Sequence, residues 1–329
     1  MNSSLIGWGF YVPERIVTNK ELESYIDTSD EWIQERSGIK ERRFFKPGKD
    51  TVSTMAAEAS KKAIEIAGIK TEDIDMIIMA TLSPDYFFPG SGVLVQRLLG
   101  LKDIPAFDIR QQCSGFIYGL SLADQYIKTG ACKTILLIGS EVQSGIMEIS
   151  DRGRDIAVLF GDGAGAVILQ ASEDLGILST HIHSDGEFAE ELYMKNPGSI
   201  DPDFVTKQMI DDGELLPYMN GRMVFKTAVQ KFPEVIEEGL VHNGLSAKDI
   251  DLFIPHQANA RITEFVREKL GLPEEKTVSN IHKYGNTTAA TIPIALAESM
   301  EAGLLKKGDL LCLAAFGSGF TWGSAFIRI

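Results

Sequence analysis

The chain repeats itself, and this repeat constrains the fold more than any other feature of the sequence. Three pairs of segments match in the same order along the chain, which indicates a duplicated unit. The pairs are GIKTEDIDMIIMAT (68–81) with GLSAKDIDLFIPHQ (244–257), CSGFIYGLSLADQYIKTG (113–130) with NTTAATIPIALAESMEAG (286–303), and FGDGAGAVIL (160–169) with FGSGFTWGSA (316–325). We therefore predict two homologous halves, residues 1–172 and 173–329.

Short apolar segments alternate with helical patterns in the first half. MIIMATL (76–82) and TILLIGS (134–140) have the length and composition typical of strands buried on both faces. Residues 51–67 and 114–128 carry apolar side chains at helical spacing, and Gly68 is expected to end the first of these helices. This alternation predicts an α/β fold built from βαβ units.

Composition excludes several functional classes. The chain has 32 Lys and Arg against 46 Asp and Glu, so its net charge of −14 argues against nucleic-acid binding. No segment has the charge pattern of a signal peptide or the length of a membrane helix. The three cysteines match neither a disulfide framework nor a zinc motif, so we expect a cytoplasmic protein without membrane insertion.

Cys113 lies in DIRQQCSGF, between a predicted strand and a predicted helix. A helix start exposes free N–H groups, which would lower the pKa of the thiol and favour a nucleophile. A buried structural thiol is the alternative, and position alone supports both interpretations. The repeat aligns Cys113 with Asn286 at the start of an equivalent helix. Cys132 and Cys312 lie beside or inside apolar strands and are predicted to be core residues.

His256 follows the apolar segment LFIP, so it should lie at the carboxyl end of a strand, where the ligand sites of α/β sheets gather. A satisfied loop histidine is the alternative, but the repeat places His256 on the same edge as Asn286. His181 and His183 alternate on a strand-like segment without a partner at metal-ligand spacing. We therefore predict no metal site there.

Three further segments are ambiguous from their residue types. GDGAGA (161–166) fits no phosphate-loop pattern and is predicted to be a structural turn. GSGFTWG (317–323) has glycines that could leave N–H groups free for an oxyanion. Trp32, close to Arg36, could stack an adenine, although a solvated helix end is the simpler interpretation.

Taken together, the motifs resemble β-ketoacyl-acyl-carrier-protein synthase III of the thiolase superfamily over essentially the full length. The motifs are GWGFYVPERIVTNKEL, DEWIQERSGIKER, CSGF, DRG followed by GDGAGA, PHQANARI, YGNTTAA and GSGFTWGSA. The resemblance implies a duplicated thiolase-like fold, a five-layer αβαβα sandwich, which agrees with the repeat. It also implies a homodimer.

The resemblance implies a decarboxylating condensation that starts fatty-acid synthesis. Cys113 would take the acyl group from acyl-CoA, and His256 and Asn286 would bind the thioester oxygen of malonyl-acyl-carrier protein as CO₂ leaves. The backbone N–H groups of Cys113 and Ser318 would form the oxyanion hole. No metal and no permanently bound cofactor are implied, since acyl-CoA and malonyl-acyl-carrier protein enter as substrates.

The resemblance also assigns a coenzyme A site, and this replaces the solvated-helix interpretation of Trp32. Trp32 and Arg152 would sandwich the adenine, with Thr28 and Arg36 close by. Asn259 would lie near the pantetheine.

Two contacts with partner molecules are implied as well. Phe88 would close the acyl pocket across the dimer. Lys226, Arg261 and Lys269 would form a basic patch for the acidic carrier protein.

Three features depart from the family pattern. Gln111 and Gln112 precede the nucleophile where small residues are common, and the glycine triplet reads GSG (317–319) instead of GGG. Residues 185–221 are long and acidic, and we expect them near the substrate entrance. The alternative function is therefore a specialised synthase of a secondary-metabolite pathway, with a longer acyl donor or a different acceptor.

Three rival classes fit less well. Papain-like proteases share the order Cys, His, Asn, but this chain lacks their CGSCW-like context and has repeated halves. HMG-CoA synthase would need a glutamate base, and TLSPD (81–85) contains none. A non-catalytic partner subunit usually loses the cysteine, which is present here.

Overall fold

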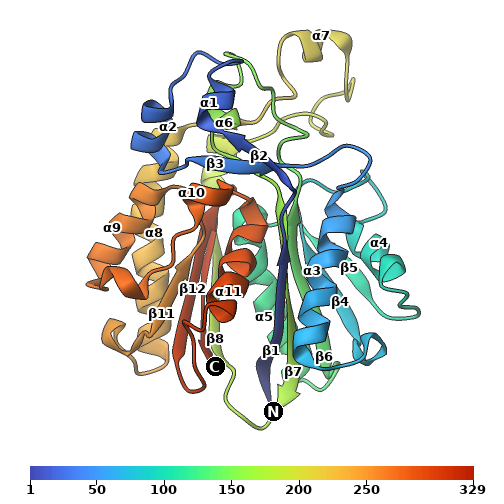
Figure 1. Cartoon of the computed structure of the whole chain (residues 1–329), viewed down its shortest axis with the longest axis vertical. Helices are drawn as coiled ribbons and strands as arrows, with labels where there is room; N and C mark the ends of the chain where they lie inside the picture. The colour runs from blue at the N-terminus through green and yellow to red at the C-terminus, as the bar shows by residue number, and fades with distance from the viewer.

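Two mixed β-sheets form the centre of the molecule, and a computed structural model describes all residues 1–329 (Figure 1). The first sheet has the order β1-β7-β6-β4-β5, and the second has the order β11-β12-β13-β8. The bounds are β1 Asn2–Tyr11, β4 Met76–Ala80, β5 Ala106–Ile109, β6 Thr134–Glu141, β7 Gly163–Ser172, β8 Ile177–Ser184, β11 Leu252–Pro255, β12 Leu310–Gly317 and β13 Thr321–Arg328. The strands predicted at 76–82 and 134–140 are thereby confirmed as β4 and β6.

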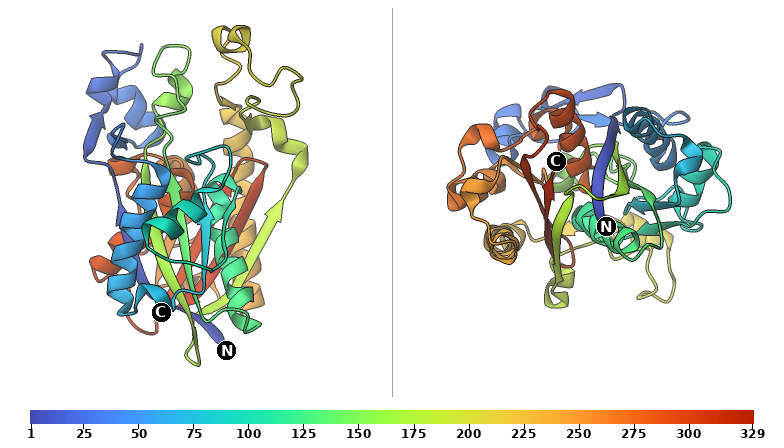
Figure 2. Two further views of the ribbon diagram at one scale, coloured as in Figure 1. Left: turned by 90° about the vertical axis from the view of Figure 1, so that its right-hand side faces the viewer. Right: turned by 90° about the horizontal axis from the view of Figure 1, so that it is seen from below.

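Helices separate the two sheets and cover their outer faces, which gives the predicted five layers (Figures 1 and 2). Helices α5 and α11 lie between the sheets and share one hydrophobic core with strands of both. Helices α3 and α4 cover the first sheet, and α8 and α9 cover the second. Their bounds are α3 Val52–Ala67, α4 Ser91–Leu98, α5 Gly115–Lys128, α8 Gly221–His242, α9 Ala260–Leu270 and α11 Thr291–Glu301.

The central strands are apolar on both sides because each side meets a helix layer. In β6, Ile135 and Leu137 join the core around α5, whereas Leu136 and Ile138 join the core under α3. All eight residues of β6 and all eight of β12 are buried. Strands of this kind are apolar throughout, which is why sequence predicted them well.

The order of strands confirms the duplication. β1, β7, β6 and β4 of the first sheet correspond to β8, β13, β12 and β11 of the second, with the same parallel and antiparallel pairings. β5 corresponds only to an isolated parallel bridge between Phe253 and Thr277. β7 of the first sheet ends at Ser172, and β8 of the second begins at Ile177.

The predicted alignment of Cys113 with Asn286 is wrong by three residues. A short turn precedes each central helix, η2 (Gln112–Ser114) before α5 and η6 (Thr288–Ala290) before α11. Gln112 and Thr288 open these turns with nearly equal positive φ angles of 44° and 45°. Backbone conformation therefore aligns Cys113 with Ala289, and Asn286 lies ahead of its turn.

The third repeat pair is also out of register. Phe316 lies inside β12, whereas Phe160 precedes β7. A long connection, residues 142–162, joins β6 to β7, but only three residues join β12 to β13. The two glycine-rich segments therefore occupy different positions in the fold despite their sequence similarity.

Two groups of small elements lie above the carboxyl ends of the central strands (Figures 1 and 2). The first is a cap around a separate small core. Its elements are β2 Arg15–Thr18, α1 Asn19–Leu22, α2 Asp30–Ser37, β3 Glu41–Phe44, α6 Arg154–Ala157 and α10 Ile281–Tyr284.

The second group is residues 185–221, here called the acidic segment. It contains η3 Gly186–Glu191, β9 Leu192–Tyr193, α7 Lys207–Asp211 and β10 Tyr218–Met219. Three short turns remain outside these groups: η1 Thr71–Asp73, η4 Ala247–Asp249 and η5 Glu274–Lys276. No helix in the structure is both long enough and apolar enough to cross a bilayer.

Candidate active site

Cys113 lies at the turn between β5 and the central helix α5, as the sequence predicts. It is 8% exposed, and the positive φ of Gln112 directs the chain sharply into the helix. The end of β12 packs directly on it, because a Cβ atom at Gly317 would lie 2.7 Å from the Cys113 Cβ. Only glycine fits at that position.

The expectation of a lowered thiol pKa is wrong for the free chain. Burial, with a smaller contribution from the Glu141 carboxylate, raises the pKa of Cys113 to about 12, against the opposing effect of the Cys113 backbone N–H. No cation pairs with the thiol, so desolvation outweighs the helix start. Cys113 is therefore a protonated thiol at rest.

His256 follows β11 directly and is 2% exposed, at the carboxyl end of the strand as predicted. Burial lowers the pKa of its imidazole to about 3, so the ring is neutral. Nδ1 lies 2.6 Å from the Thr291 hydroxyl, whereas Nε2 is buried without any partner. An unpartnered buried nitrogen leaves one hydrogen-bonding position open for a ligand.

The tautomer of His256 depends on a single hydroxyl proton. The Thr291 hydroxyl has two acceptors in reach, His256 Nδ1 at 2.6 Å and the Thr288 carbonyl at 3.0 Å. If Thr291 donates to Nδ1, then Nε2 carries the ring hydrogen and can donate to a ligand. If Thr291 donates to Thr288, then Nδ1 carries the hydrogen and Nε2 can only accept.

Asn286 is 6% exposed and is oriented by the same turn as His256. Its Oδ1 accepts the Thr288 N–H at 2.8 Å, while no group of the chain accepts from its Nδ2. The amide group is therefore fixed with its N–H donors free. Thr288 of η6 orients Asn286, and Thr291, the first residue of α11, orients His256.

Ser318 begins the hairpin between β12 and β13, next to the Gly317 contact with Cys113. Its side chain donates to the Leu192 carbonyl of the acidic segment, so the hydroxyl points away from the thiol. Ser114 donates to the Thr321 carbonyl at 3.0 Å and holds the same hairpin on η2. The backbone of Gly317 thus lies against Cys113.

The face of Trp32 is covered by two arginines. The Arg36 and Arg154 guanidinium carbons lie 4.7 and 5.6 Å from its ring centroid. The Thr28 hydroxyl is buried without a partner nearby in the chain. Asn259 caps α9 and donates to the Arg36 carbonyl at 2.8 Å, so it joins α9 to α2.

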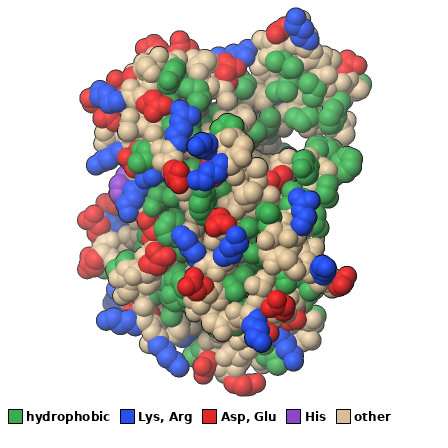
Figure 3. All heavy atoms as spheres, turned by 45° about the vertical axis from the view of Figure 1, so that its right-hand side comes forward, with side chains coloured by type: hydrophobic (Ala, Val, Ile, Leu, Met, Phe, Trp, Pro, Cys, Tyr) green, Lys and Arg blue, Asp and Glu red, His purple; other side chains and the backbone are tan.

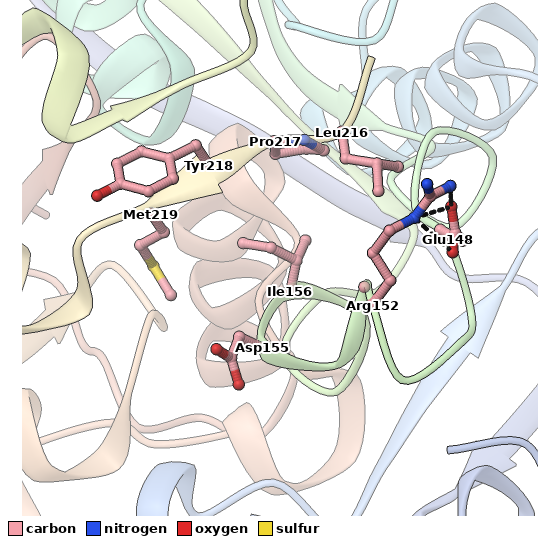
Figure 4. A pocket seen from close by; sticks show the side chains of 9 residues that line it. Glu148, Arg152, Asp155, Ile156, Leu216, Pro217, Tyr218 and Met219 are labelled. Atoms are coloured by element: carbon pink, nitrogen blue, oxygen red, sulfur yellow. Dashed lines mark hydrogen bonds and ion pairs between the residues drawn. The ribbon is translucent and has the colours of Figure 1, made fainter. Parts of the chain in front are cut away.

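Arg152 makes other contacts than the expected sandwich with Trp32. It pairs with Glu148 and donates to the Asp211 carbonyl of α7 at 2.8 Å. It lines a pocket of about 200 Å³ together with Pro217 and Tyr218 of the acidic segment (Figure 4). Its guanidinium is occupied by a carboxylate and a carbonyl, which attract it more strongly than a ring face.

The acidic segment contacts the hairpin beside Cys113 and the candidate site residue Arg152. Leu192 accepts from Ser318, Phe188 stacks on Phe320 at 5.2 Å between ring centroids, and α7 accepts from Arg152.

Phe88 is 81% exposed, so it lines no pocket of its own chain. Its neighbour Phe87 packs edge-on against Phe204 of the acidic segment, at 5.8 Å between centroids. Figure 3 shows hydrophobic side chains gathered on the upper part of one face. Exposed aromatic clusters of this kind mark interaction surfaces.

The predicted docking residues lie exposed on α8 and α9, which pack together. None of Lys226, Arg261 and Lys269 forms an ion pair, although Arg261 lies 5.7 Å from the Phe225 ring. By contrast, Arg267 on the same helix is neutralised by Glu264.

The remaining sequence features have structural roles. Cys132 and Cys312 are buried core residues, as predicted. Asp162 of GDGAGA is buried and accepts hydrogen bonds from the Phe45 and Ser144 backbone N–H groups, but the predicted turn over 161–166 is wrong, because Gly163–Ala166 already belong to β7. His181 and His183 both contact Glu238.

Sequence reasoning missed three residues around the site: Thr291, Arg154 and Glu141. Threonines and buried acids near a turn have no distinctive spacing. Arg154 directly follows the DRG motif, and this adjacency was the one sequence signal that could have linked Arg154 to the site.

Two family models match the chain. Residues 107–186 match 3-oxoacyl-[acyl-carrier-protein] synthase III, and residues 240–329 match the C-terminal part of the same family. Together these ranges cover more than half of the chain and include Cys113, His256 and Asn286.

Full-length relatives agree with these models. The β-ketoacyl-[acyl-carrier-protein] synthase III of Escherichia coli K12 is 44% identical over 328 residues, covering 100% of both chains. The crystal structure of the Aquifex aeolicus 3-oxoacyl-[acyl-carrier-protein] synthase III superposes with a TM-score of 0.92 at 44% identity, covering 99% of this chain and 100% of that one. The priming β-ketosynthase of the R1128 polyketide pathway superposes with a TM-score of 0.90 at 32% identity, covering 99% and 96%.

Proposed function

The chain belongs to the β-ketoacyl-acyl-carrier-protein synthase III family and catalyses the condensation that initiates fatty-acid synthesis, and we propose that Cys113, His256 and Asn286 perform it. The observation that supports these roles best is that neighbouring residues, Thr288 of η6 and Thr291 at the start of α11, orient the free positions of Asn286 and His256. A neutral imidazole and an amide suit the binding of a developing oxyanion.

In the first step, the Cys113 sulfur attacks the carbonyl carbon of an acyl-CoA. The new S–C bond replaces the C–S bond to CoA, and the thiol proton leaves with the CoA sulfur. The backbone N–H groups of Cys113 and Ser318 bind the oxyanion of the tetrahedral intermediate. This stabilisation is needed because the resting thiol has a pKa of about 12.

In the second step, malonyl-acyl-carrier protein loses CO₂. The electrons of the broken C–C bond pass to the thioester oxygen, where His256 Nε2–H and Asn286 Nδ2–H donate hydrogen bonds to the enolate. This role requires the tautomer in which Thr291 donates to His256 Nδ1, the shorter of its two contacts.

In the third step, the enolate carbon attacks the acyl-Cys113 carbonyl. The new C–C bond replaces the S–C bond, and one proton is taken up to restore the thiol. The product is 3-oxoacyl-acyl-carrier protein. These steps call for no resident cofactor or metal.

We assign the coenzyme A site to Thr28, Trp32, Arg36, Arg152 and Asn259. The orphan Thr28 hydroxyl and the arginines around Trp32 offer donors and cations to a phosphorylated nucleotide. The ion pair with Glu148 and the bond to the Asp211 carbonyl hold the Arg152 guanidinium through its N–H groups, which leaves its faces available for stacking.

We also propose a cytoplasmic homodimer that binds acyl-carrier protein. The exposed Phe87 and Phe88 are suited to burial against a second copy, where Phe88 would close the partner's acyl pocket. Lys226, Arg261 and Lys269 supply unpaired positive charge for the acidic carrier.

A specialised synthase with a longer acyl donor or another acceptor is the second candidate. The long acidic segment at the entrance favours it, and so does the likeness to a polyketide priming ketosynthase.

Intact-protein mass spectrometry after incubation with acetyl- to dodecanoyl-CoA separates these candidates. A short acyl adduct on Cys113, absent from Cys113→Ala, is expected for the fatty-acid starter. Adducts only from medium or long donors support the specialised synthase. An adduct that persists in Cys113→Ala shows that the nucleophile is another residue.

A further inference from the structure

Glu141 is a fully buried acid that has no part in the reaction derived above. It ends β6, and its carboxylate accepts hydrogen bonds from the Ser83 hydroxyl at 2.6 Å, the Leu82 N–H at 3.2 Å and the Gln143 amide at 3.2 Å. The Thr81 hydroxyl donates at 3.3 Å. A buried carboxylate with this many donors is costly to assemble, which makes a purely incidental role a poor explanation.

The duplication explains where this carboxylate lies. The strand ends of β6 and β12 are equivalent, so Glu141 corresponds to Gly317, and Cys113 corresponds to Ala289. Gly317, from the second half of the chain, packs against Cys113, from the first half. In the equivalent contact, Glu141 lies beside Ala289, and the approach is close enough that a Cβ at Gly139 would lie 2.3 Å from the Ala289 carbonyl oxygen.

Contacts from η6 also face the Glu141 carboxylate. Burial raises its pKa to about 7, and the Thr288 hydroxyl and Ala289 N–H are among the donors that oppose the rise. The Thr288 hydroxyl is buried without a hydrogen-bond partner, and Ala289 packs against β6 at Gly139, two residues before Glu141. The turn η6 therefore lies against the strand end that carries this carboxylate.

The turn η6 is the element that orients the two proposed enolate-binding residues. The Thr288 N–H fixes Asn286, and Thr291, the first residue after η6, contacts His256 Nδ1. A shift of η6 would move both groups together, whereas Cys113 is carried by η2 and α5.

We propose that Glu141 is a positioning residue for the condensation step, holding η6 in the place that aligns His256 and Asn286. The proposal rests on the function proposed above. It predicts that a change at Glu141 separates the two half-reactions, because acylation of Cys113 does not use η6. Misplacing a catalytic group by about 1 Å can cost about 100-fold in rate.

The test compares Glu141→Gln with wild type in two assays at pH 8, where the carboxylate is ionised. The first is single-turnover acylation of Cys113 by an acyl-CoA that wild type accepts. The second is condensation of the acylated enzyme with malonyl-acyl-carrier protein. The amide of glutamine turns a donor toward groups that are themselves donors, so η6 loses its support while the side-chain volume is kept.

Loss of the Glu141 charge also lowers the pKa of Cys113, so we expect Glu141→Gln to acylate at least as fast as wild type and to condense at least about tenfold more slowly. Asp124→Asn is the matched control, since Asp124 is also a buried acid but has Ser3 and Lys128 as its partners. It should change both steps by the same factor.

Equal losses in both steps of Glu141→Gln, or unimpaired condensation, would overturn the proposal. If wild type acylates but never condenses with malonyl-acyl-carrier protein, the proposed function itself fails and this inference with it. If Glu141→Gln does not fold, Thr288→Val removes the hydroxyl facing Glu141 at constant shape and must show the same split between steps.

Discussion

At the scale of single residues, burial controls the ionisation of the groups proposed to react. Cys113 and His256 are both nearly inaccessible, and in each case desolvation favours the neutral form. The thiol and the imidazole are therefore not an ion pair of the kind found in cysteine proteases. Neutral groups suit a reaction in which loss of CO₂ supplies the carbanion.

Alkylation of Cys113 should depend steeply on pH. With a pKa of about 12, the thiolate fraction rises about tenfold per pH unit from pH 7 to 10. The rate of iodoacetamide modification, measured by mass spectrometry, should rise accordingly without a plateau. Cys113→Ala corrects for the two core cysteines, and a plateau near pH 8 would contradict the prediction.

His256 should make the folded state sensitive to acid. Its folded pKa of about 3 lies below the unfolded value of about 6.5, so the unfolded chain binds the proton first as the pH falls. The stability from this neutral residue is complete above pH 6.5 and decreases below it, by about 2 kcal/mol at pH 5.

Urea unfolding at pH 7 and pH 5 measures this loss. Wild type should lose about 2 kcal/mol more than His256→Gln between the two pH values. Glu141 and Asp162, whose raised pKa values act in the opposite direction, are present in both proteins and cancel in the comparison. Equal losses in the two proteins would rule the effect out.

At the scale of elements, short turns and loops position the site, while the long helices and strands support them. The turn η2 carries Cys113, η6 and the first residue of α11 orient Asn286 and His256, and the acidic segment contacts the hairpin beside Cys113. The acidic segment depends on few contacts of its own, since α7 has only one buried residue, Met209.

Arg152→Ala should loosen the acidic segment. It removes the hydrogen bond to the Asp211 carbonyl and the ion pair with Glu148. We expect trypsin to cleave after Lys195 or Lys207 several-fold faster, because cleavage follows local opening. Peptide mapping identifies the site.

Lys231→Ala is the matched control for Arg152→Ala. It also removes an exposed cation paired with a carboxylate, Glu234, but lies on α8. An equal increase in cleavage in both variants would contradict a specific role for Arg152.

At the scale of the whole molecule, charge is distributed unevenly. The chain carries a net charge of −14, yet unpaired cations project from α8 and α9 beside the cap. A local patch of positive charge on an acidic protein attracts an acidic partner to that patch and so orients the partner as it approaches.

Arg261→Glu should weaken use of the carrier protein without affecting the acyl donor. We expect KM for malonyl-acyl-carrier protein to rise about tenfold at low salt, and this difference to shrink as salt screens the contact. KM for acyl-CoA should remain unchanged. Steady-state kinetics at two salt concentrations provide the measurement.

Lys248→Glu serves as the control for Arg261→Glu. It makes the same charge change on η4, which precedes β11 and so lies at the opposite end of that strand from His256. A similar rise in KM would show that net charge matters and not the position on α9.

Sequence alone determined the layered duplicated fold and the identity of the main candidate residues. Buried strands such as β6 are apolar throughout, and helices such as α3 combine a 3.6-residue apolar period with an αL glycine at Gly68. These signals are local, so they survive without knowledge of the fold. Family motifs supplied the roles of Cys113, His256 and Asn286.

Only the tertiary structure decided the register and the electrostatics of the site. Cys113 aligns with Ala289 because equivalent turns are defined by their backbone torsion angles and not by sequence similarity. The raised pKa of Cys113, the contacts of Arg152 and the place of Glu141 depend on groups far apart in the chain. Desolvation and hydrogen bonding act through space, and a single sequence records neither distance nor burial.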